Sequence, residues 1–340
     1  MSEIAIIGAG AWGTALAIVL GRNERHRVRL WVHDKEICAD IVRRRGNERF
    51  LPGCPLPDGV NPTNDWEQAL EGAEMVVSVV PSQHCRGVFE GMRAYLEPGM
   101  LLVSASKGIE STSQMRMTEV IRDVVRARAG FDPRLGALSG PSFAFEVARG
   151  DPTAITTASG DAEVAATVQR EFSDPSFRVY TNEDVIGVEL GGALKNVIAI
   201  AAGVGAGLGL QHNSTAALIT RGLAEMTRLV VACGGKAETM AGLAGLGDLV
   251  LTCTGGPSRN RSVGLELGRG GKLAEIIAAM HGMVAEGILT TTAALGLARS
   301  KGVEMPITEG VYAILHNGKD PREAIHDLMT RSGRSEGSTG

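Results

Sequence analysis

The stretch EIAIIGAGAWGTALAIVL, residues 3–20, predicts a strand, a glycine turn and a helix in immediate succession. Residues 3–7 have the apolar character of a short buried strand. Gly8, Gly10 and Gly13 follow with the spacing G-x-G-x-x-G. In this pattern the first glycine permits a tight turn, the second lets the backbone approach a pyrophosphate, and the third lets helix and strand pack closely. Because the helix N-terminus then presents free N–H groups to an anion, the sequence predicts a dinucleotide-binding site.

The bulk properties exclude several classes of protein. The chain has 340 residues, of which 44% are hydrophobic and 21% charged, which is typical of a globular protein with room for two domains. A formal net charge of −4 gives no sign of a nucleic-acid-binding surface. The apolar stretches are interrupted well short of a membrane span, and strand residues at position 3 leave no room for a signal peptide.

Cysteine and histidine usage also narrows the possibilities. The five cysteines are scattered and form no C-x-x-C pair, which favours reduced thiols in a cytoplasmic protein over disulfides or zinc ligands. The seven histidines do not cluster at metal-ligand spacing. The motifs of zinc proteases, serine hydrolases and P-loop proteins are absent, so we expect no metal site.

Further apolar runs lie in the first half of the chain, with helical patterns between them. They cover residues 28–32, 75–80, 100–105, 134–139, 154–157 and 177–180. Near-continuous apolar strands that alternate with helices are typical of a parallel sheet covered on both faces. Ligands of such sheets bind beyond the carboxyl ends of the strands. The sequence places Val80-Pro81, Lys107-Gly108 and Gly140-Pro141 at that edge.

The character of the chain changes from about Glu183. Helical patterns cover residues 185–204, 215–233, 273–280, 290–300, 307–316 and 321–330, with glycine-rich segments between them. The sequence therefore predicts an α/β protein with a doubly wound, parallel-sheet, Rossmann-type dinucleotide-binding domain over residues 1–184. It predicts an all-α substrate and catalytic domain over residues 185–331. We expect residues 332–340 to form a disordered tail.

Lys195 is the most unusual side chain of the second half. It lies in the middle of the apolar helical pattern 189–202, and the polar amide of Asn196 follows it. Buried lysines are rare unless they are paired. Burial lowers the pKa of a lysine, so that it can act as a general acid or base near neutral pH. A lysine on the solvent face of an amphipathic helix is the alternative, but other polar residues are scarce on this helix.

Lys107 and three residues of the second half carry groups suited to a polar substrate. Lys107 follows a predicted strand and can reach a phosphate or a carbonyl oxygen, although a solvated lysine at a strand end fits the spacing equally well. Asp248 lies among glycines, where its carboxylate can orient an ammonium group. Arg259 can bind a phosphate through two hydrogen bonds, and Asn260 can hold a hydroxyl group. Taken singly, each of these last three is more typical of an ordinary turn.

His33 and Asp34 end the second predicted strand, where the adenosine ribose of a dinucleotide is expected to lie. An acidic residue there accepts a hydrogen bond from the 2′-hydroxyl of NAD. A basic residue there suits the 2′-phosphate of NADP. Because this chain has one of each, the spacing alone leaves the coenzyme open.

Seven short motifs, in this order, resemble those of the bacterial NAD(P)-dependent sn-glycerol-3-phosphate dehydrogenases. They are GAGAWGTAL (8–16), SKGIE (106–110), GPSFA (140–144), LKN (194–196), GLGDL (245–249), SRN (258–260) and VAEG (284–287). The likeness runs from about residue 3 to residue 330. Seven motifs in the family's order are far more specific than the opening glycines alone.

The resemblance implies a reversible reduction of dihydroxyacetone phosphate to sn-glycerol 3-phosphate, which feeds phospholipid synthesis, by a homodimer. It implies that Lys195 is the proton donor and acceptor. The implied substrate contacts are Lys107, Gly140, Ser142, Lys195, Asp248, Ser258, Arg259 and Asn260. Together with the glycine turn, the implied cofactor contacts are Gly8, Gly10, Ala11, Trp12, Gly13, His33, Lys107, Ala144, Arg259, Val284 and Glu286.

Two positions depart from the family pattern. Ala11 stands where a serine is common, which removes a hydroxyl contact but leaves the backbone cradle. Val32 stands where a small residue or an arginine is frequent, next to the adenosine pocket. The resemblance places His33 in that pocket, able to face a 2′-phosphate, while Asp34 can turn outward and cap the next helix. We therefore expect both NAD and NADP to serve, with a modest preference for NADPH.

Two other functions fit parts of the sequence pattern. A dehydrogenase of the same architecture could act on a β-hydroxy acid or an acyl thioester, and a panel of substrates would separate the two. A non-catalytic dinucleotide sensor would need no buried lysine, so Lys195 and Lys107 argue against it. The sequence thus favours an oxidoreductase with a small-molecule substrate and no nucleic-acid partner.

Overall fold

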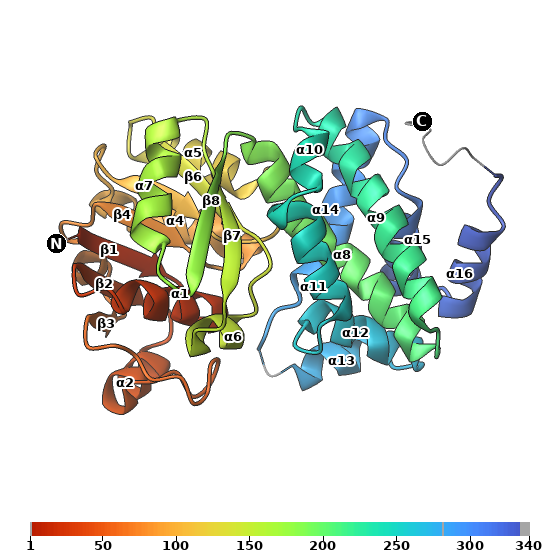
Figure 1. The fold of residues 1–340 in the computed structure, drawn as a ribbon, viewed down its shortest axis with the longest axis horizontal. Coiled ribbons are helices and arrows are strands. Elements are labelled where there is room, and N and C mark those ends of the chain that lie inside the picture. The colour runs from red at the N-terminus through yellow and green to blue at the C-terminus, as the bar shows by residue number, and fades with distance from the viewer. Residues whose placement is uncertain (1, 281, 334–340) are drawn as a thin grey trace.

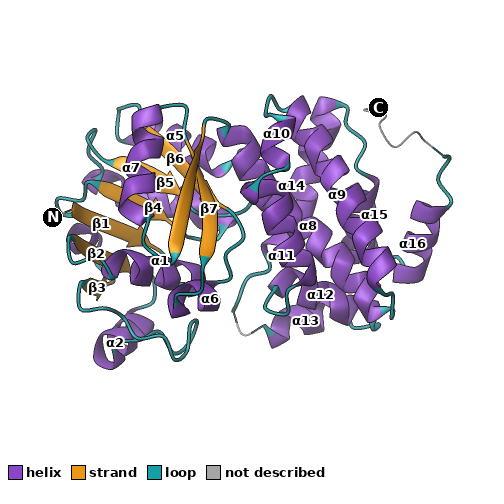
Figure 2. Ribbon diagram, in the orientation of Figure 1, coloured by secondary structure: helices purple, strands orange, loops and turns teal. Residues whose placement is uncertain are grey.

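The computed structural model describes residues 2–280 and 282–333. Two parts lie side by side in Figure 1: an α/β part that ends with the last strand, and a helical part that begins at Val185. Figure 2 shows that all the described strands belong to the first part. The expected all-α second domain is confirmed. Most of the tail expected to be disordered, residues 334–340, lies outside the described residues.

The first part is built on one sheet in which the predicted strands are present. The strands are β1 (Ser2–Ile7), β2 (His26–Trp31), β3 (Val60–Thr63), β4 (Met75–Ser78), β5 (Leu101–Ser104), β6 (Arg134–Ser139), β7 (Thr153–Ala158) and β8 (Phe177–Asn182). Their order is β3-β2-β1-β4-β5-β6-β7-β8. Strand β3 was not predicted from the sequence, because Pro62 and polar neighbours hide a four-residue strand.

One pair of strands corrects the expectation of a fully parallel sheet. Every neighbouring pair is parallel except β6 and β7, which are antiparallel. The connection between them holds only the six-residue helix α6 (Ala144–Arg149). Such a helix is about 9 Å long, whereas a six-residue strand spans about 20 Å. The helix is therefore too short to return the chain to the edge from which β6 starts.

Helices cover both faces of the sheet, as predicted. They are α1 (Ala11–Gly21), α2 (Lys35–Arg44), α3 (Trp66–Leu70), α4 (Cys85–Met92), α5 (Met117–Arg128), α6 and α7 (Ala162–Phe172), with short 3₁₀ turns η1 (Ser82–His84) and η2 (Arg93–Tyr95). Successive residues of β1 point to opposite faces. Ile4 and Ile6 pack with α1 and α7, while Ala5 and Ile7 pack with α4 and α5. Burial on both faces explains why these strands read as continuous apolar runs.

The second part is a bundle of helices around a central one. It contains α8 (Val185–Gly207), α9 (His212–Ala232), α10 (Ala237–Met240), the π-helical turn η3 (Leu243–Gly247), α11 (Asp248–Thr254), α12 (Arg259–Gly268), α13 (Leu273–Ala279), α14 (Glu286–Lys301), α15 (Pro306–Asn317) and α16 (Pro321–Met329). The interpretation of Asp248, Arg259 and Asn260, taken singly, as ordinary turn residues was wrong, because Asp248 is the first residue of α11, and Arg259 and Asn260 are the first two of α12. The glycine-rich residues before Asp248 form η3, which leads directly into α11, and Ser258 is the N-cap of α12.

The central helix α8 is packed on all sides. A Cβ on Gly264 of α12 would lie 2.0 Å from the carbonyl oxygen of Ile200, so the two helices touch at glycine. By length and apolar composition α8 is the one described helix that could cross a membrane, but 83% of its most apolar window is buried inside the protein. Its apolar character therefore serves the core of the bundle.

Candidate active site

The glycine turn lies between β1 and α1, as the opening stretch predicts. Gly8 has a φ of 112°, a left-handed conformation that favours glycine. A Cβ on Gly13 would lie 1.8 Å from the carbonyl oxygen of Gly8, so only glycine lets the helix pass the strand. Gly10 is the N-cap of α1 and no side chain caps this helix. The main-chain N–H groups of Ala11 and Trp12, in the first turn of α1, are free to bind an anion such as the pyrophosphate of a dinucleotide.

Gly10 offers a direct test of this placement. Its backbone is extended (φ −69°, ψ 179°), and no heavy atom lies within 4 Å of an added Cβ. We expect Gly10→Val to fold but to weaken NAD(P)H binding about tenfold or more, because the valine occupies the space above the turn. Fluorescence titration measures the Kd, and Gly99→Val, an exposed glycine with equal space, is the control. Unchanged affinity in the folded Gly10 variant would place the pyrophosphate elsewhere.

Asp248 joins the two predicted lysines. Its Oδ1 lies 2.9 Å from Nζ of Lys195, and its Oδ2 lies 2.8 Å from Nζ of Lys107. Lys195 comes from α8, Asp248 is the first residue of α11, and Lys107 comes from the loop after β5. Asp248 is only 1% exposed and Lys195 only 6%, so this pairing is shielded from water. The interpretation of Lys195 as a buried, paired lysine is confirmed.

Burial lowers the pKa of Lys195 to about 8, against the opposing effect of the Asp248 carboxylate. The Lys107 ammonium lowers the pKa of Lys195 further. Nζ of Lys195 also donates to the hydroxyl of Thr252 at 2.8 Å, and that hydroxyl donates to the main-chain oxygen of Asp248 at 2.6 Å. Lys195 is therefore held in place with both its protonated and its neutral form accessible near neutral pH.

Lys107 gathers the predicted residues of the loop after β6. Its Nζ donates to the carbonyl oxygen of Gly140 at 2.8 Å and lies 3.4 Å from Oγ of Ser142. The same Nζ lies 5.9 Å from the centre of the Trp12 ring, beside the glycine turn. Ala144 begins α6 two residues beyond Ser142. The geometry thus brings predicted cofactor and substrate residues to one edge of the sheet.

Ser258, Arg259 and Asn260 form the N-terminus of α12. Ser258 is the N-cap, and its Oγ accepts from the N–H of Arg261 at 3.2 Å. Arg259 is exposed and its side chain makes no hydrogen bond with residues 2–280 and 282–333, but desolvation lowers the pKa of its guanidinium against the opposing effect of the Glu286 carboxylate. A guanidinium whose hydrogen-bond donors are unused, beside a helix N-terminus, suits a phosphate group. Asn260 differs, because its amide points inward and bonds to Asn196.

Glu286 and Val284 lie where the helical part meets the end of β4. Glu286 is the first residue of α14, and Val284 lies in the loop before it. The Glu286 carboxylate accepts from the main-chain N–H of Ser82 at 2.9 Å and also from the Ser82 hydroxyl. Burial raises the pKa of Glu286. This contact links the two parts of the chain beside the cofactor edge.

His33 and Asp34 take different places at the end of β2. One carboxylate oxygen of Asp34 accepts from the N–H groups of Glu36 and Ile37, both at 2.9 Å, so Asp34 caps α2. The expectation that Asp34 caps the next helix is confirmed. His33 is exposed, with its ring 5.7 Å from that of Trp31. The histidine is thus the residue of the two left available to a ribose or its phosphate.

Two family models match this chain, and together they cover most of it. The N-terminal model of NAD-dependent glycerol-3-phosphate dehydrogenase matches residues 3–165, and the C-terminal model matches residues 184–326. The chain belongs to the NAD-dependent glycerol-3-phosphate dehydrogenase family. The resemblance stated from the seven motifs is confirmed.

Relatives of the NAD-dependent glycerol-3-phosphate dehydrogenase family match almost end to end. A glycerol-3-phosphate dehydrogenase [NAD(P)+] of Koribacter versatilis is 65% identical over 336 residues, which is 99% of each chain. One from Acidobacterium capsulatum is 56% identical over 339 residues, 99% of this chain and 100% of the relative. The crystal structure of the Coxiella burnetii glycerol-3-phosphate dehydrogenase has a TM-score of 0.91 at 42% identity, covering 97% of this chain and 99% of that one.

Three polar residues of this family member escaped the set of predicted site residues. Thr252 bonds to Lys195, Asn196 lies within the site, and Ser82 holds Glu286. Thr252 lies four positions after Asp248, a spacing that places both on one helix face. That signal depends on assigning residues 248–254 to a helix, which the neighbouring glycines obscured. Ser82 carries no signal beyond its place after a strand.

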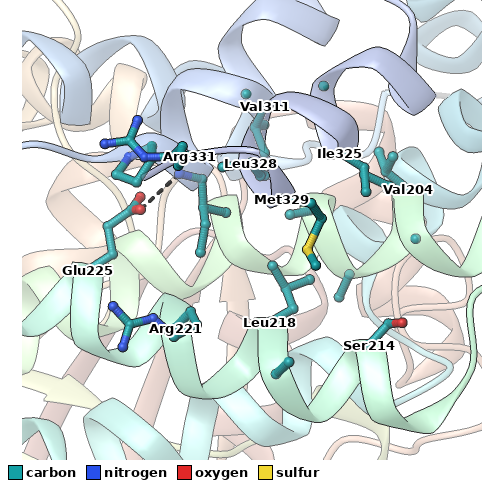
Figure 3. A pocket seen from close by; sticks show the side chains of 18 of the residues that line it. Val204, Ser214, Leu218, Arg221, Glu225, Val311, Ile325, Leu328, Met329 and Arg331 are labelled. Carbon is teal, nitrogen blue, oxygen red and sulfur yellow. Dashed lines mark hydrogen bonds between the residues drawn. The ribbon is translucent and has the colours of Figure 1, made fainter. Parts of the chain in front are cut away.

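A large apolar cavity lies away from these residues. It has a volume of about 800 Å³ and lies between α8, α9, α15 and α16. Figure 3 shows apolar side chains such as Leu218, Leu328 and Met329 on its walls, with Arg221 and Arg331 at one end. None of the predicted cofactor or substrate residues lines it. This cavity is therefore separate from the candidate active site.

Proposed function

We propose that this chain catalyses the reversible NAD(P)-dependent reduction of dihydroxyacetone phosphate to sn-glycerol 3-phosphate, with Lys195 as general acid and base. The observation that carries the proposal is the buried pairing of Lys195 with Asp248, together with a Lys195 pKa of about 8. The relatives named glycerol-3-phosphate dehydrogenase [NAD(P)+] support the substrate and the coenzyme pair. The product would supply phospholipid synthesis.

The residues around Lys195 suit the chemistry of a ketone. The nicotinamide of the bound cofactor supplies the hydride. As negative charge develops on the carbonyl oxygen, the Lys195 ammonium stabilises it and delivers a proton. In the oxidation direction, neutral Lys195 takes the hydroxyl proton. Asp248 and Thr252 hold the Lys195 Nζ atom, so a proton can move without a change in its position.

The substrate phosphate requires cationic groups with hydrogen-bond donors that can reach it. Arg259 supplies an exposed guanidinium, and the start of α12 supplies N–H groups beside it. Lys107 is the second cation, shared between Asp248 and the carbonyl oxygen of Gly140. We propose that Arg259 and Ser258 bind the phosphate, with Lys107 between the substrate and the cofactor. Gly140, Ser142 and Ala144 complete that wall of the site.

One assay tests the proposed reaction. Purified protein with NADPH or NADH should oxidise the cofactor when dihydroxyacetone phosphate is added, and should form one sn-glycerol 3-phosphate for each cofactor consumed. Turnover of 6-phosphogluconate or a hydroxyacyl thioester, with none on dihydroxyacetone phosphate, would replace this function by that of a related dehydrogenase.

We propose that both coenzymes serve and that NADPH is modestly preferred, because Asp34 is occupied as a cap and His33 is free. His33→Asp should shift the ratio of kcat/KM values toward NADH by about tenfold, since a carboxylate repels the 2′-phosphate and accepts from a 2′-hydroxyl. The exposed His212 of α9 provides the control substitution His212→Asp. If the wild type strongly favours NADH and His33→Asp leaves the ratio unmoved, His33 does not read the ribose.

We also propose that the protein works as a homodimer in the cytoplasm. Each chain has two domains, with the boundary between residues 184 and 185. The family resemblance implies the dimer, and the apolar cavity between α8, α9, α15 and α16 (Figure 3) offers a surface for such a contact. All five cysteines are free, as suits a reducing compartment. Sedimentation equilibrium should give twice the chain mass of 35.6 kDa, whereas a single 35.6 kDa species at all concentrations would contradict the dimer.

A further inference from the structure

Two asparagine side chains form a continuous line of hydrogen bonds beneath the lysine pair. The main-chain N–H of Gly287 donates to Oδ1 of Asn260 at 2.9 Å. Nδ2 of Asn260 donates to Oδ1 of Asn196 at 2.9 Å, and Nδ2 of Asn196 donates to the main-chain oxygen of Lys107 at 3.2 Å. Asn196 is 4% exposed and Asn260 8%, so water does not compete for these bonds.

The direction of this asparagine line is fixed at both ends by the backbone. The Gly287 N–H can only donate, so an acceptor of Asn260 must face it. The Lys107 carbonyl can only accept, so the amide nitrogen of Asn196 must face it. Each asparagine therefore has one orientation that satisfies both neighbours. A side chain that can only accept, placed at either position, leaves two acceptor oxygens facing each other. Flipping the amide of the remaining asparagine only moves this mismatch to another place in the line.

Each member of the asparagine line adjoins a predicted site residue in the sequence. Asn196 follows Lys195, Asn260 follows Arg259, and Gly287 follows Glu286. The line thus joins α8, α12 and α14, which contact one another, to the loop after β5. Its far end also returns to that loop, because Glu286 bonds to Ser82 and a Cβ on Gly108 would meet the Ser82 side chain at 2.4 Å.

Gly287 shows how closely these parts are fitted. A Cβ at this position would lie 2.7 Å from the main-chain oxygen of Asn196 and 2.8 Å from Oδ1 of Asn260. The start of α14 therefore rests directly on the two asparagines. The two amides are therefore tied to the main chain on both sides of the line, at Lys107 and at Gly287, which follows Glu286.

We propose that Asn196 and Asn260 are positioning residues. Their line of hydrogen bonds fixes the positions of Lys107 and of the start of α14 relative to Lys195. The inference rests on the proposed function and adds to it. It assigns a role to Asn196, and it gives Asn260 a second role besides the substrate contact implied by resemblance. Both amides act through Lys107 and Glu286 rather than on the reacting atoms.

The test uses an aspartate, which switches with pH between two hydrogen-bonding patterns. In Asn196→Asp, the protonated acid donates to the Lys107 oxygen and accepts from Asn260, as the amide does. The ionised acid is an acceptor only. We expect kcat/KM for dihydroxyacetone phosphate to fall about 10- to 100-fold at pH 8.5 relative to the wild type. The ratio of variant to wild type should recover as the pH is lowered toward 5.5.

A direct charge effect on Lys195 would give a different pH dependence. The new carboxylate would then raise the pKa of that lysine and keep it protonated to higher pH. The ratio of variant to wild-type kcat/KM would therefore rise at alkaline pH instead. Asn260→Asp should show the same acid-side recovery as Asn196→Asp. If Asn260 only contacts the substrate, Asn196→Asp will leave kcat/KM unchanged. Asn213→Asp, an exposed change in the first turn of α9, is the control, and thermal unfolding at each pH confirms a folded protein.

The wild-type assay separates failure of the function from failure of this inference. Turnover by the wild type tests the function, and the ratio of variant to wild type tests the asparagine line. If dihydroxyacetone phosphate is not a substrate, the Kd for NADPH of the variant is compared with that of the wild type at each pH instead. This comparison is informative because Lys107 and Glu286 are predicted cofactor contacts. Acid-side recovery in both aspartate variants supports the proposal, and a pH-independent ratio overturns it.

Discussion

Replacing Lys195 with methionine is expected to lower kcat for dihydroxyacetone phosphate reduction by at least about 100-fold, the scale of a lost general acid. Methionine keeps an unbranched side chain in the same buried space but removes the proton and the positive charge. The Kd for NADPH should change little, because Lys195 is not among the predicted cofactor contacts. Steady-state rates and a fluorescence titration on the same preparation measure the two quantities.

Lys301→Met is the matched control for Lys195. Lys301 is the exposed last residue of α14, so its replacement should leave both kcat and Kd unchanged. A Lys195→Met enzyme that turns over at nearly the wild-type rate would show that water or another group supplies the proton.

Asp248→Asn is expected to reduce kcat/KM by about 100-fold and to destabilise the fold. The change leaves the ammonium groups of Lys195 and Lys107 without the carboxylate between them. Removing one partner of a buried ion pair costs about 3–5 kcal/mol. The pKa of Lys195 should fall below its value of about 8 in the wild type, because the Asp248 carboxylate raises it and the Lys107 ammonium lowers it. The alkaline limb of the reduction rate should then move to lower pH.

Thermal unfolding and pH–rate profiles measure these two effects. Asp327→Asn is the control, since Asp327 pairs with Lys319 at the exposed surface, where an ion pair contributes little. An Asp248→Asn enzyme whose alkaline limb stays where it is in the wild type would remove Asp248 from the control of Lys195.

The local hydrophobic pattern of the sequence was enough to predict the buried strands and the unusual position of Lys195. Strands buried on both faces read as apolar runs, and β6 was predicted with its observed bounds. Lys195 stood out because α8 offers it few polar neighbours. The antiparallel joining of β7 depends instead on how far a short helix carries the chain. That property belongs to the three-dimensional path and leaves no periodic signal.

Long-range pairing explains the rest of what the sequence did not reveal. The sequence suggested that Asp248 could orient an ammonium group, but Asp248 is 141 positions from Lys107, and nothing in its glycine-rich surroundings identifies which lysines are its partners. The same glycines made the starts of α11 and α12 read as turns, although Gly245 packs closely inside the helical part, where an added Cβ would lie 2.2 Å from the main-chain oxygen of Met240. Asn260 was expected to face only a substrate, whereas its amide completes a line of hydrogen bonds through α8 and α14.

The pH dependence of the wild-type enzyme in both directions tests the central claim, that Lys195 is the acid and base. Reduction of dihydroxyacetone phosphate needs the protonated amine, and oxidation of sn-glycerol 3-phosphate needs the neutral one. With the pKa of Lys195 at about 8, kcat for reduction should fall as the pH rises through 8, while kcat for oxidation rises over the same range. Two profiles that change in the same direction there, or that show no titration near pH 8, would contradict this role for Lys195.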